Sequence, residues 1–111
     1  GEDGNIVRVA GDYKATEESI GAQPLDRIQT LGEGLVYVTS LRDGTVTVID
    51  PVQLRVLSRI EVGRGAHDIS FMLSEEGELR GYVSLFEEHK IIILDLQPGS
   101  SQRFTVIGEI D

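Results

Sequence analysis

The sequence contains an internal repeat, which constrains the fold more than any other feature. LVYVTSLRDGTVTVID (residues 35–50) and RGYVSLFEEHKIIILD (residues 80–95) each place two strand-forming runs around a polar turn and end in Asp. At an offset of 45 residues, Tyr37 aligns with Tyr82 and Asp50 aligns with Asp95. A fixed period of this length is typical of architectures in which each repeat buries one face against its neighbour.

The same offset continues past the second hairpin, where Val62 aligns with Ile107 and Gly63 aligns with Gly108. Both glycines suit a tight passage between repeats. Earlier in the chain, DGNIVRV (residues 3–9) aligns with DGTVTVI (residues 43–49) of the next copy. The open faces of such an array favour association, so we expect either a piece of a longer chain, which we favour, or copies that assemble. We predict three repeats within one domain: the end of a first (1–20), a second (21–63) and a third (64–111).

Each complete repeat carries four strand signals bounded by turn residues. Four short strands per period favour an all-β fold built from four-stranded antiparallel β-propeller blades; a compact β-sandwich or barrel is the alternative. Residues 13–20 have little β-branching and break the pattern. The predicted strands are 25–30, 35–40, 45–50 and 55–62 in the second repeat, and 68–73, 81–86, 90–95 and 103–107 in the third.

The strand ends carry residues that suit structural turns. Asp43-Gly44 fits a tight hairpin, because glycine adopts positive φ readily and aspartate tolerates it. Asp50 and Asp95 each end a strand where the chain turns, and their carboxylates can accept backbone N–H bonds there. We therefore assign Asp43, Gly44, Asp50 and Asp95 to the scaffold.

Composition argues against several classes of function. The chain has 111 residues and a formal net charge of −9. It lacks the clustered Lys and Arg that nucleic acids or anionic membranes require. The absence of Cys excludes disulfides, thiolate metal sites and thiol nucleophiles. No apolar run approaches the ~20 residues of a spanning helix, so we predict no membrane insertion. No nucleophile elbow or phosphate-binding loop is present, so catalysis is not predicted.

The repeats resemble the YVTN family of β-propeller repeats, which occur in bacterial and archaeal surface and periplasmic proteins. The resemblance covers most of residues 21–111 and is interrupted by an insertion at 98–101. It implies a propeller fold and a periplasmic or extracellular location, but it says little about function because the family's repeats are architectural. The motifs that carry it are VYVTS (36–40), TVTVID (45–50), RIEVG (59–63) and GAHDISF (65–71), with YVS and IIILD in the third repeat.

His67 is the candidate ligand-binding residue, with Asp68 beside it to orient the ring. A neutral imidazole where the chain enters the innermost strand of a blade can ligate haem or a divalent metal. A structural hydrogen bond is the favoured interpretation, because the equivalent position in the preceding copy is Gln23. Residues 87–89 (Glu-Glu-His) are interpreted as a solvated turn, since adjacent turn residues rarely converge on one ion.

These features favour a non-catalytic β-propeller scaffold that presents loops to a protein or a surface glycan. Its other expected partners are further blades of the same propeller or further copies of the chain. We predict no cofactor and no metal site. The alternative is part of a periplasmic, cofactor- or metal-dependent enzyme, in which His67 serves a haem or a divalent metal at the central channel.

Overall fold

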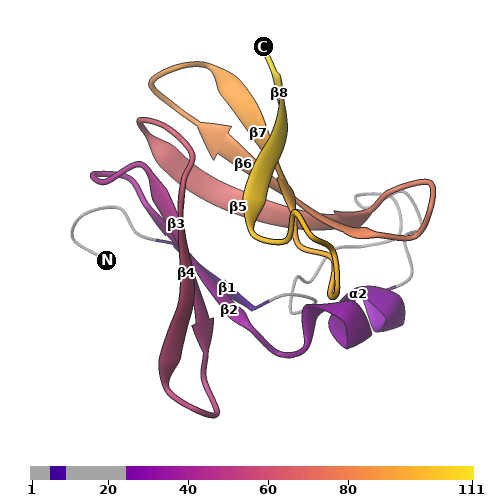
Figure 1. The fold of residues 1–111 in the computed structure, drawn as a ribbon. Helices are drawn as coiled ribbons and strands as arrows, with labels where there is room; N and C mark the ends of the chain where they lie inside the picture. The colour runs from indigo at the N-terminus through magenta and orange to yellow at the C-terminus, as the bar shows by residue number, and fades with distance from the viewer. Residues whose placement is uncertain (1–5, 10–24) are drawn as a thin grey trace.

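The computed structural model describes residues 6–9 and 25–111 (Figure 1). Within this part of the chain, strands dominate and one helix precedes the second strand. The elements are β1 (Ile6–Val9), α2 (Leu25–Gly32), β2 (Val36–Ser40), β3 (Thr45–Asp50), β4 (Arg55–Glu61), β5 (Ala66–Leu73), β6 (Leu79–Leu85), β7 (Lys90–Asp95) and β8 (Thr105–Ile110).

The strands form two antiparallel sheets of four, in the orders β1-β2-β3-β4 and β5-β6-β7-β8. Each sheet is a meander, because neighbouring strands in the sheet follow one another in the sequence. The two sheets meet mainly where β2 and β5 approach each other, as Figure 1 shows. The prediction of a mostly β chain with antiparallel pairing is therefore confirmed, and two predicted strands (45–50 and 90–95) coincide with β3 and β7.

Residues 25–30, which were predicted as a strand, belong to helix α2, so that prediction is wrong. Leu25, Ile28 and Leu31 recur every three residues, which is the spacing of one helical face and not of a strand. Ile28 is buried and Leu31 packs against the core. The helix ends at Gly32, and the next two residues adopt positive φ, which is a common way to terminate a helix.

The first strand of the first sheet is β1, which pairs with β2 from Ile6↔Thr39 to Val9↔Val36. The predicted division at residue 20 placed these residues in a preceding repeat, whereas β1 completes the sheet that holds β2 to β4. The chain passes from the first sheet to the second between Glu61 and Ala66. Residues 13–20, whose sequence breaks the repeat pattern, lie outside the described residues.

The second and third strands of the two sheets share one register at an offset of 45 residues. Tyr37 pairs with Val48 in the first sheet, and Tyr82 pairs with Ile93 in the second. A β-bulge follows Val48 in the pairing of β3 with β4, and another follows Ile93 in the pairing of β7 with β8. The bulges therefore recur at equivalent positions, where they increase the twist of each sheet.

The fourth strands do not follow the offset of 45, so the predicted alignment of Val62 with Ile107 and of Gly63 with Gly108 is wrong. The β7–β8 connection is longer than the β3–β4 connection, because it contains the Pro-Gly-Ser-Ser insertion. The insertion shifts the strand alignment to 50 residues, and Gly108 lies within β8 instead of at a turn. The pairs that set this alignment are Val46↔Ile60 and Ile91↔Ile110.

One apolar core joins the two sheets and the helix. At its centre the Tyr37 ring on β2 contacts the Phe71 ring on β5 edge to face, with 5.1 Å between centroids. Beside this pair, the Thr39 hydroxyl donates to the carbonyl oxygen of His67 at 2.8 Å, which ties β2 to β5. The other apolar residues of the core are Ile28, Leu35, Val46, Val48, Ile60, Val62, Ala66, Ile69, Leu79, Val83, Leu85, Ile92, Leu94 and Leu96.

The β2–β3 turn is held against the connection between the sheets. Gly44 has a φ of 70°, and its carbonyl oxygen accepts hydrogen bonds from the amides of Val62 at 2.9 Å and Gly63 at 3.1 Å. A Cβ atom on Gly44 would lie 2.6 Å from the carbonyl oxygen of Gly63. Both the backbone conformation and the close approach therefore require glycine at this turn.

Candidate functional site

His67 lies at an irregular point in β5, where the pairing with β6 shifts register between Ala66 and Asp68. Its imidazole is half-buried and stacks on the Phe86 ring, with 4.2 Å between centroids and 23° between planes. The Asp68 carboxylate accepts a hydrogen bond from the amide of Ile69 at 2.8 Å. Across residues 6–9 and 25–111, no group of three or more His, Cys, Asp or Glu side chains could hold a metal ion. The arrangement around His67 is therefore one of aromatic packing and backbone hydrogen bonds.

The β6–β7 turn, residues 86–89, is attached to the connection between the two sheets. The Phe86 amide donates to the Gly65 carbonyl oxygen at 2.9 Å. The Arg64 guanidinium contacts the Glu87 carboxylate at 3.2 Å, and the Arg64 amide donates to the Glu88 carboxylate at 2.9 Å. These bonds fix the turn on its inner side, while the Phe86 side chain remains 60% exposed. These contacts attach residues 86–89, hereafter the held turn, to the connection between the sheets. The held turn exposes the Phe86 ring between Glu87 and Glu88 on one side and His67 on the other.

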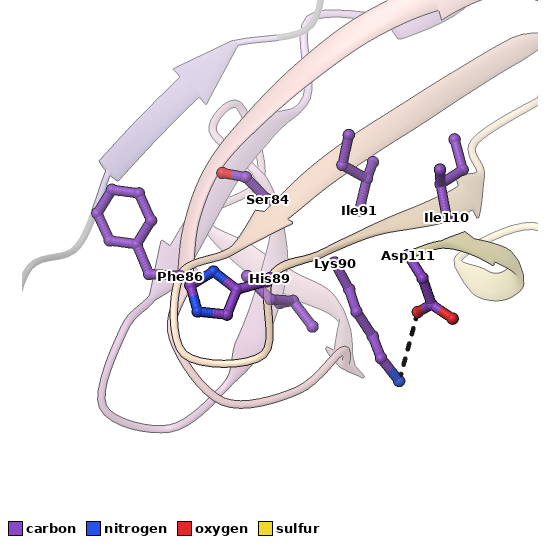
Figure 2. Close-up of a pocket in the computed structure, with 8 residues that line it drawn as sticks. Ser84, Phe86, His89, Lys90, Ile91, Ile110 and Asp111 are labelled. Atoms are coloured by element: carbon purple, nitrogen blue, oxygen red, sulfur yellow. Dashed lines mark ion pairs between the residues drawn. The ribbon is translucent and has the colours of Figure 1, made fainter.

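A hollow of about 470 Å³ lies beside this turn on the outer face of the second sheet (Figure 2). Its floor is apolar, and Figure 2 shows Ser84, Ile91 and Ile110 along three neighbouring strands. Charged groups stand only at its edge. The lining residues are Ser84, Leu85, Phe86, His89, Lys90, Ile91, Ile110 and Asp111.

Lys90 stands at the edge of the hollow and is held by carboxylates. Its ammonium lies 2.9 Å from the Glu109 carboxylate and 3.9 Å from the Asp111 carboxylate. The hydrogen bond with Glu109, more than any other contact, raises the pKa of Lys90 and lowers the pKa of Glu109. Because the amine is kept protonated, Lys90 can neutralise a negative charge but cannot act as a nucleophile at neutral pH.

The aspartates that were assigned to turns make the hydrogen bonds that such turns require. The Asp50 carboxylate accepts from the amide of Val52 at 2.9 Å, and the Asp95 carboxylate accepts from the amide of Gln97 at 2.9 Å. Asp95 is buried and also forms an ion pair with Arg80 at 3.3 Å. Both carboxylates are therefore occupied in closing turns.

The other turn residues have simpler environments. Asp43 is exposed, and its amide donates to the Ser40 hydroxyl at 3.3 Å in the β2–β3 turn. Gly63 has a φ of 134° in the connection between the sheets. A Cβ atom on Gly63 would lie 2.8 Å from the Leu85 side chain, so the connection passes close to β6. These residues position the loops and provide no reactive group.

Sequence reasoning did not identify Phe86 and Arg64, which give the turn its character. Phe86 aligns with Leu41 in the other repeat, so the pattern indicated only an apolar position. Arg64 is a single basic residue whose proximity to Glu87 depends on how the two sheets pack. A large aromatic residue directly before two glutamates was the one available signal.

In the described segments, no helix is long and apolar enough to cross a membrane. Two comparisons with known proteins bear on the identity of the chain. No protein-family model matches it, and no curated protein sequence matches it either.

Proposed function

We propose that the chain is a non-catalytic β-propeller scaffold that presents its loops to a protein or surface ligand outside the cytoplasm. The two four-stranded meanders, with equivalent bulges 45 residues apart, support the interpretation of each sheet as a blade. The resemblance to YVTN repeats supports both the propeller and the location. The observation that carries the binding function is the held turn at residues 86–89, which exposes an aromatic ring on a rigid frame.

The chemistry of this turn favours a basic partner. Phe86 is followed directly by Glu87 and Glu88, and the whole chain carries a formal charge of −9. An arginine side chain can stack on an exposed aromatic ring while it pairs with neighbouring carboxylates. Because Arg64 already holds both glutamates in place, the turn is ordered before a partner binds. That order lowers the entropic cost of association.

An amide NMR titration tests this proposal with two peptides of equal length, one rich in arginine and the other rich in glutamate. We expect the arginine peptide alone to shift resonances at residues 64–67 and 86–89. Phe86→Ala should weaken its binding about fivefold, the equivalent of ~1 kcal/mol from the lost cation–π contact. Val52→Ala is the matched control, because Val52 is 89% exposed on another loop. Equal responses to the two peptides, or none, would contradict the proposal.

A cofactor-dependent enzyme is the competing function, and His67 is the residue that distinguishes it. The stacking of His67 on Phe86 gives the imidazole a structural role that requires no ligand. Haem and Zn²⁺ should each be added separately to the wild-type chain and to His67→Ala. A stoichiometric complex that forms with the wild type and is lost in the variant would overturn the non-catalytic scaffold.

A further inference from the structure

The first sheet packs one particular face against the second sheet. Tyr37, Thr39 and Val46 belong to this face, which is buried against β5 and its surroundings. Cross-strand pairing extends the face to β4, where Ile60 stands opposite Val46. Val46 and Ile60 are 0% and 5% exposed. This face of the first sheet is therefore the surface against which β5, the first strand of the second sheet, packs.

The same face recurs on the second sheet, where the described residues place no further sheet against it. The strand register equates Thr39 with Ser84, Val46 with Ile91, and Ile60 with Ile110. Ile91 and Ile110 are 39% and 49% exposed, although their equivalents are buried. Two isoleucines that lie side by side on neighbouring strands and remain exposed form an apolar patch of the kind that marks an interface.

On the first sheet, β5 begins next to Thr39. The hollow beside the β6–β7 turn lies at the corresponding position on the second sheet. Ser84, Ile91 and Ile110 all line it. On the first sheet, the equivalent Thr39 hydroxyl donates to the backbone carbonyl of His67, at the start of β5. The hollow thus has the chemistry of the surface that receives β5: an apolar floor and one hydroxyl that can meet a backbone carbonyl.

The complementary surface is present on the same chain. The second sheet packs against the first with a face that includes Val83, Ile92 and Leu94, all of which are buried. At an offset of 45 residues, the equivalent positions on the first sheet are Val38, Thr47 and Ile49, and these side chains are only half-buried. One chain therefore carries a second, only partly buried copy of each of the two faces that form its own sheet-to-sheet interface.

We propose that a second copy of this chain docks head to tail, with its first sheet laid on the outer face of β6, β7 and β8. The contact repeats the packing that already joins the two sheets of one chain. An interface of this heterologous kind closes into a ring if the rotation permits and otherwise propagates. The inference rests on strand register and exposure, and it does not depend on ligand binding at residues 86–89.

Sedimentation velocity at increasing concentrations of the chain tests the proposal. We expect the wild type to form species larger than a monomer, and Ile110→Asp to weaken association at least tenfold, because a carboxylate would be buried without a partner. Thr47→Glu alters the opposite surface and should weaken association as well. Val52→Asp introduces the same charge on the exposed β3–β4 turn, outside both sets of residues, and should have no effect. Circular dichroism checks that each variant is folded.

Mixing the two interface variants makes the test specific for head-to-tail docking. A copy with Ile110→Asp keeps an intact first sheet, and a copy with Thr47→Glu keeps an intact second sheet. The mixture should therefore form a one-to-one dimer through the single undamaged interface. A wild type that stays monomeric at all concentrations would overturn the proposal. A mixture that shows no heterodimer would overturn it too, since a symmetric contact between two outer faces could not be rescued in this way.

Discussion

Tyr37 is the residue whose substitution tests the packing between the sheets most directly. Its side chain is fully buried, and its hydroxyl is the one buried side-chain polar atom in the described part of the chain without a hydrogen-bond partner. Its ring, in contrast, is well packed edge to face against Phe71. Tyr37→Phe removes the unpaired hydroxyl and retains the ring, so we expect the variant to be more stable than the wild type.

The magnitude follows from the cost of burying a polar group without a partner. That cost is about 1–3 kcal/mol, and the small gap left by the lost oxygen offsets part of the gain. We therefore expect Tyr37→Phe to raise the free energy of unfolding by about 1 kcal/mol. A chain of 111 residues has an unfolding entropy on the order of 230 cal/mol/K, so the melting temperature should rise by about 4 °C.

The pH dependence supplies a second signature of the same burial. Burial raises the pKa of Tyr37 above its ordinary value of 10.0, and the nearby Arg103 opposes this only in part. Above pH 10 the unfolded chain loses this proton while the folded chain keeps it. The wild type should thus lose up to about 1.4 kcal/mol of stability per pH unit from this group, a loss that Tyr37→Phe escapes.

Urea denaturation of the wild type and Tyr37→Phe at pH 7 and near pH 11 measures both effects. Tyr82→Phe is the matched control, because Tyr82 stands at the equivalent register position but is only half-buried. We expect no change in stability for that variant. A loss of 1 kcal/mol or more for Tyr37→Phe at pH 7 would refute the reasoning, since it would mean that the hydroxyl makes a stabilising hydrogen bond.

Four further substitutions probe other parts of the structure. In urea titrations, Gly44→Ala should lower the free energy of unfolding by more than ~2 kcal/mol, because it adds a backbone clash to the strain of positive φ. Gly34→Ala is the control, because Gly34 has the same φ of 70° but lies in open space. It should lower the free energy of unfolding by only about 1 kcal/mol. Arg103→Met should lower the free energy of unfolding by about 1 kcal/mol, since the guanidinium pairs with Glu33 at 2.7 Å; an unchanged melting curve would contradict this. Lys90→Met should lower the melting temperature slightly between pH 5 and 10, and the difference should vanish in high salt because the Lys90 ion pair is exposed.

The strands that the sequence predicts best are those whose pattern is set by local chemistry. The strands at 45–50 and 90–95 are rich in β-branched residues and are bounded by turns, so their limits match β3 and β7. Helix α2 was missed because the repeat alignment imposed a strand on residues 25–30, although the apolar residues there recur every three positions. The fourth strand of the third repeat was misaligned because an insertion in a loop leaves no mark on the strand that follows.

The candidate site was predicted less well than the fold, for a physical reason. The contacts that define it join residues far apart in the sequence, such as Arg64 to Glu87 and Arg103 to Glu33. Such contacts depend on how the two sheets pack, and a pattern of alternating residues does not determine that packing. His67 was identified because an imidazole at the entry to the innermost strand of a blade can ligate a metal, yet the ring that stacks on it, Phe86, belongs to another strand end.

The contrast between Tyr37 and Tyr82 shows what the repeat alone cannot determine. The two residues occupy the same position in the same register, yet one lies at the centre of the core and the other on an outer face. The difference arises because the first sheet has a neighbour on that face, whereas the described residues place none on the second. If head-to-tail docking occurs, Tyr82 becomes buried as Tyr37 is. Amide exchange around Tyr82 should then slow with increasing protein concentration in the wild type but not in Ile110→Asp. Exchange that is equally fast in both at every concentration would show that the exposed face is a stable feature of the chain and not half of an interface.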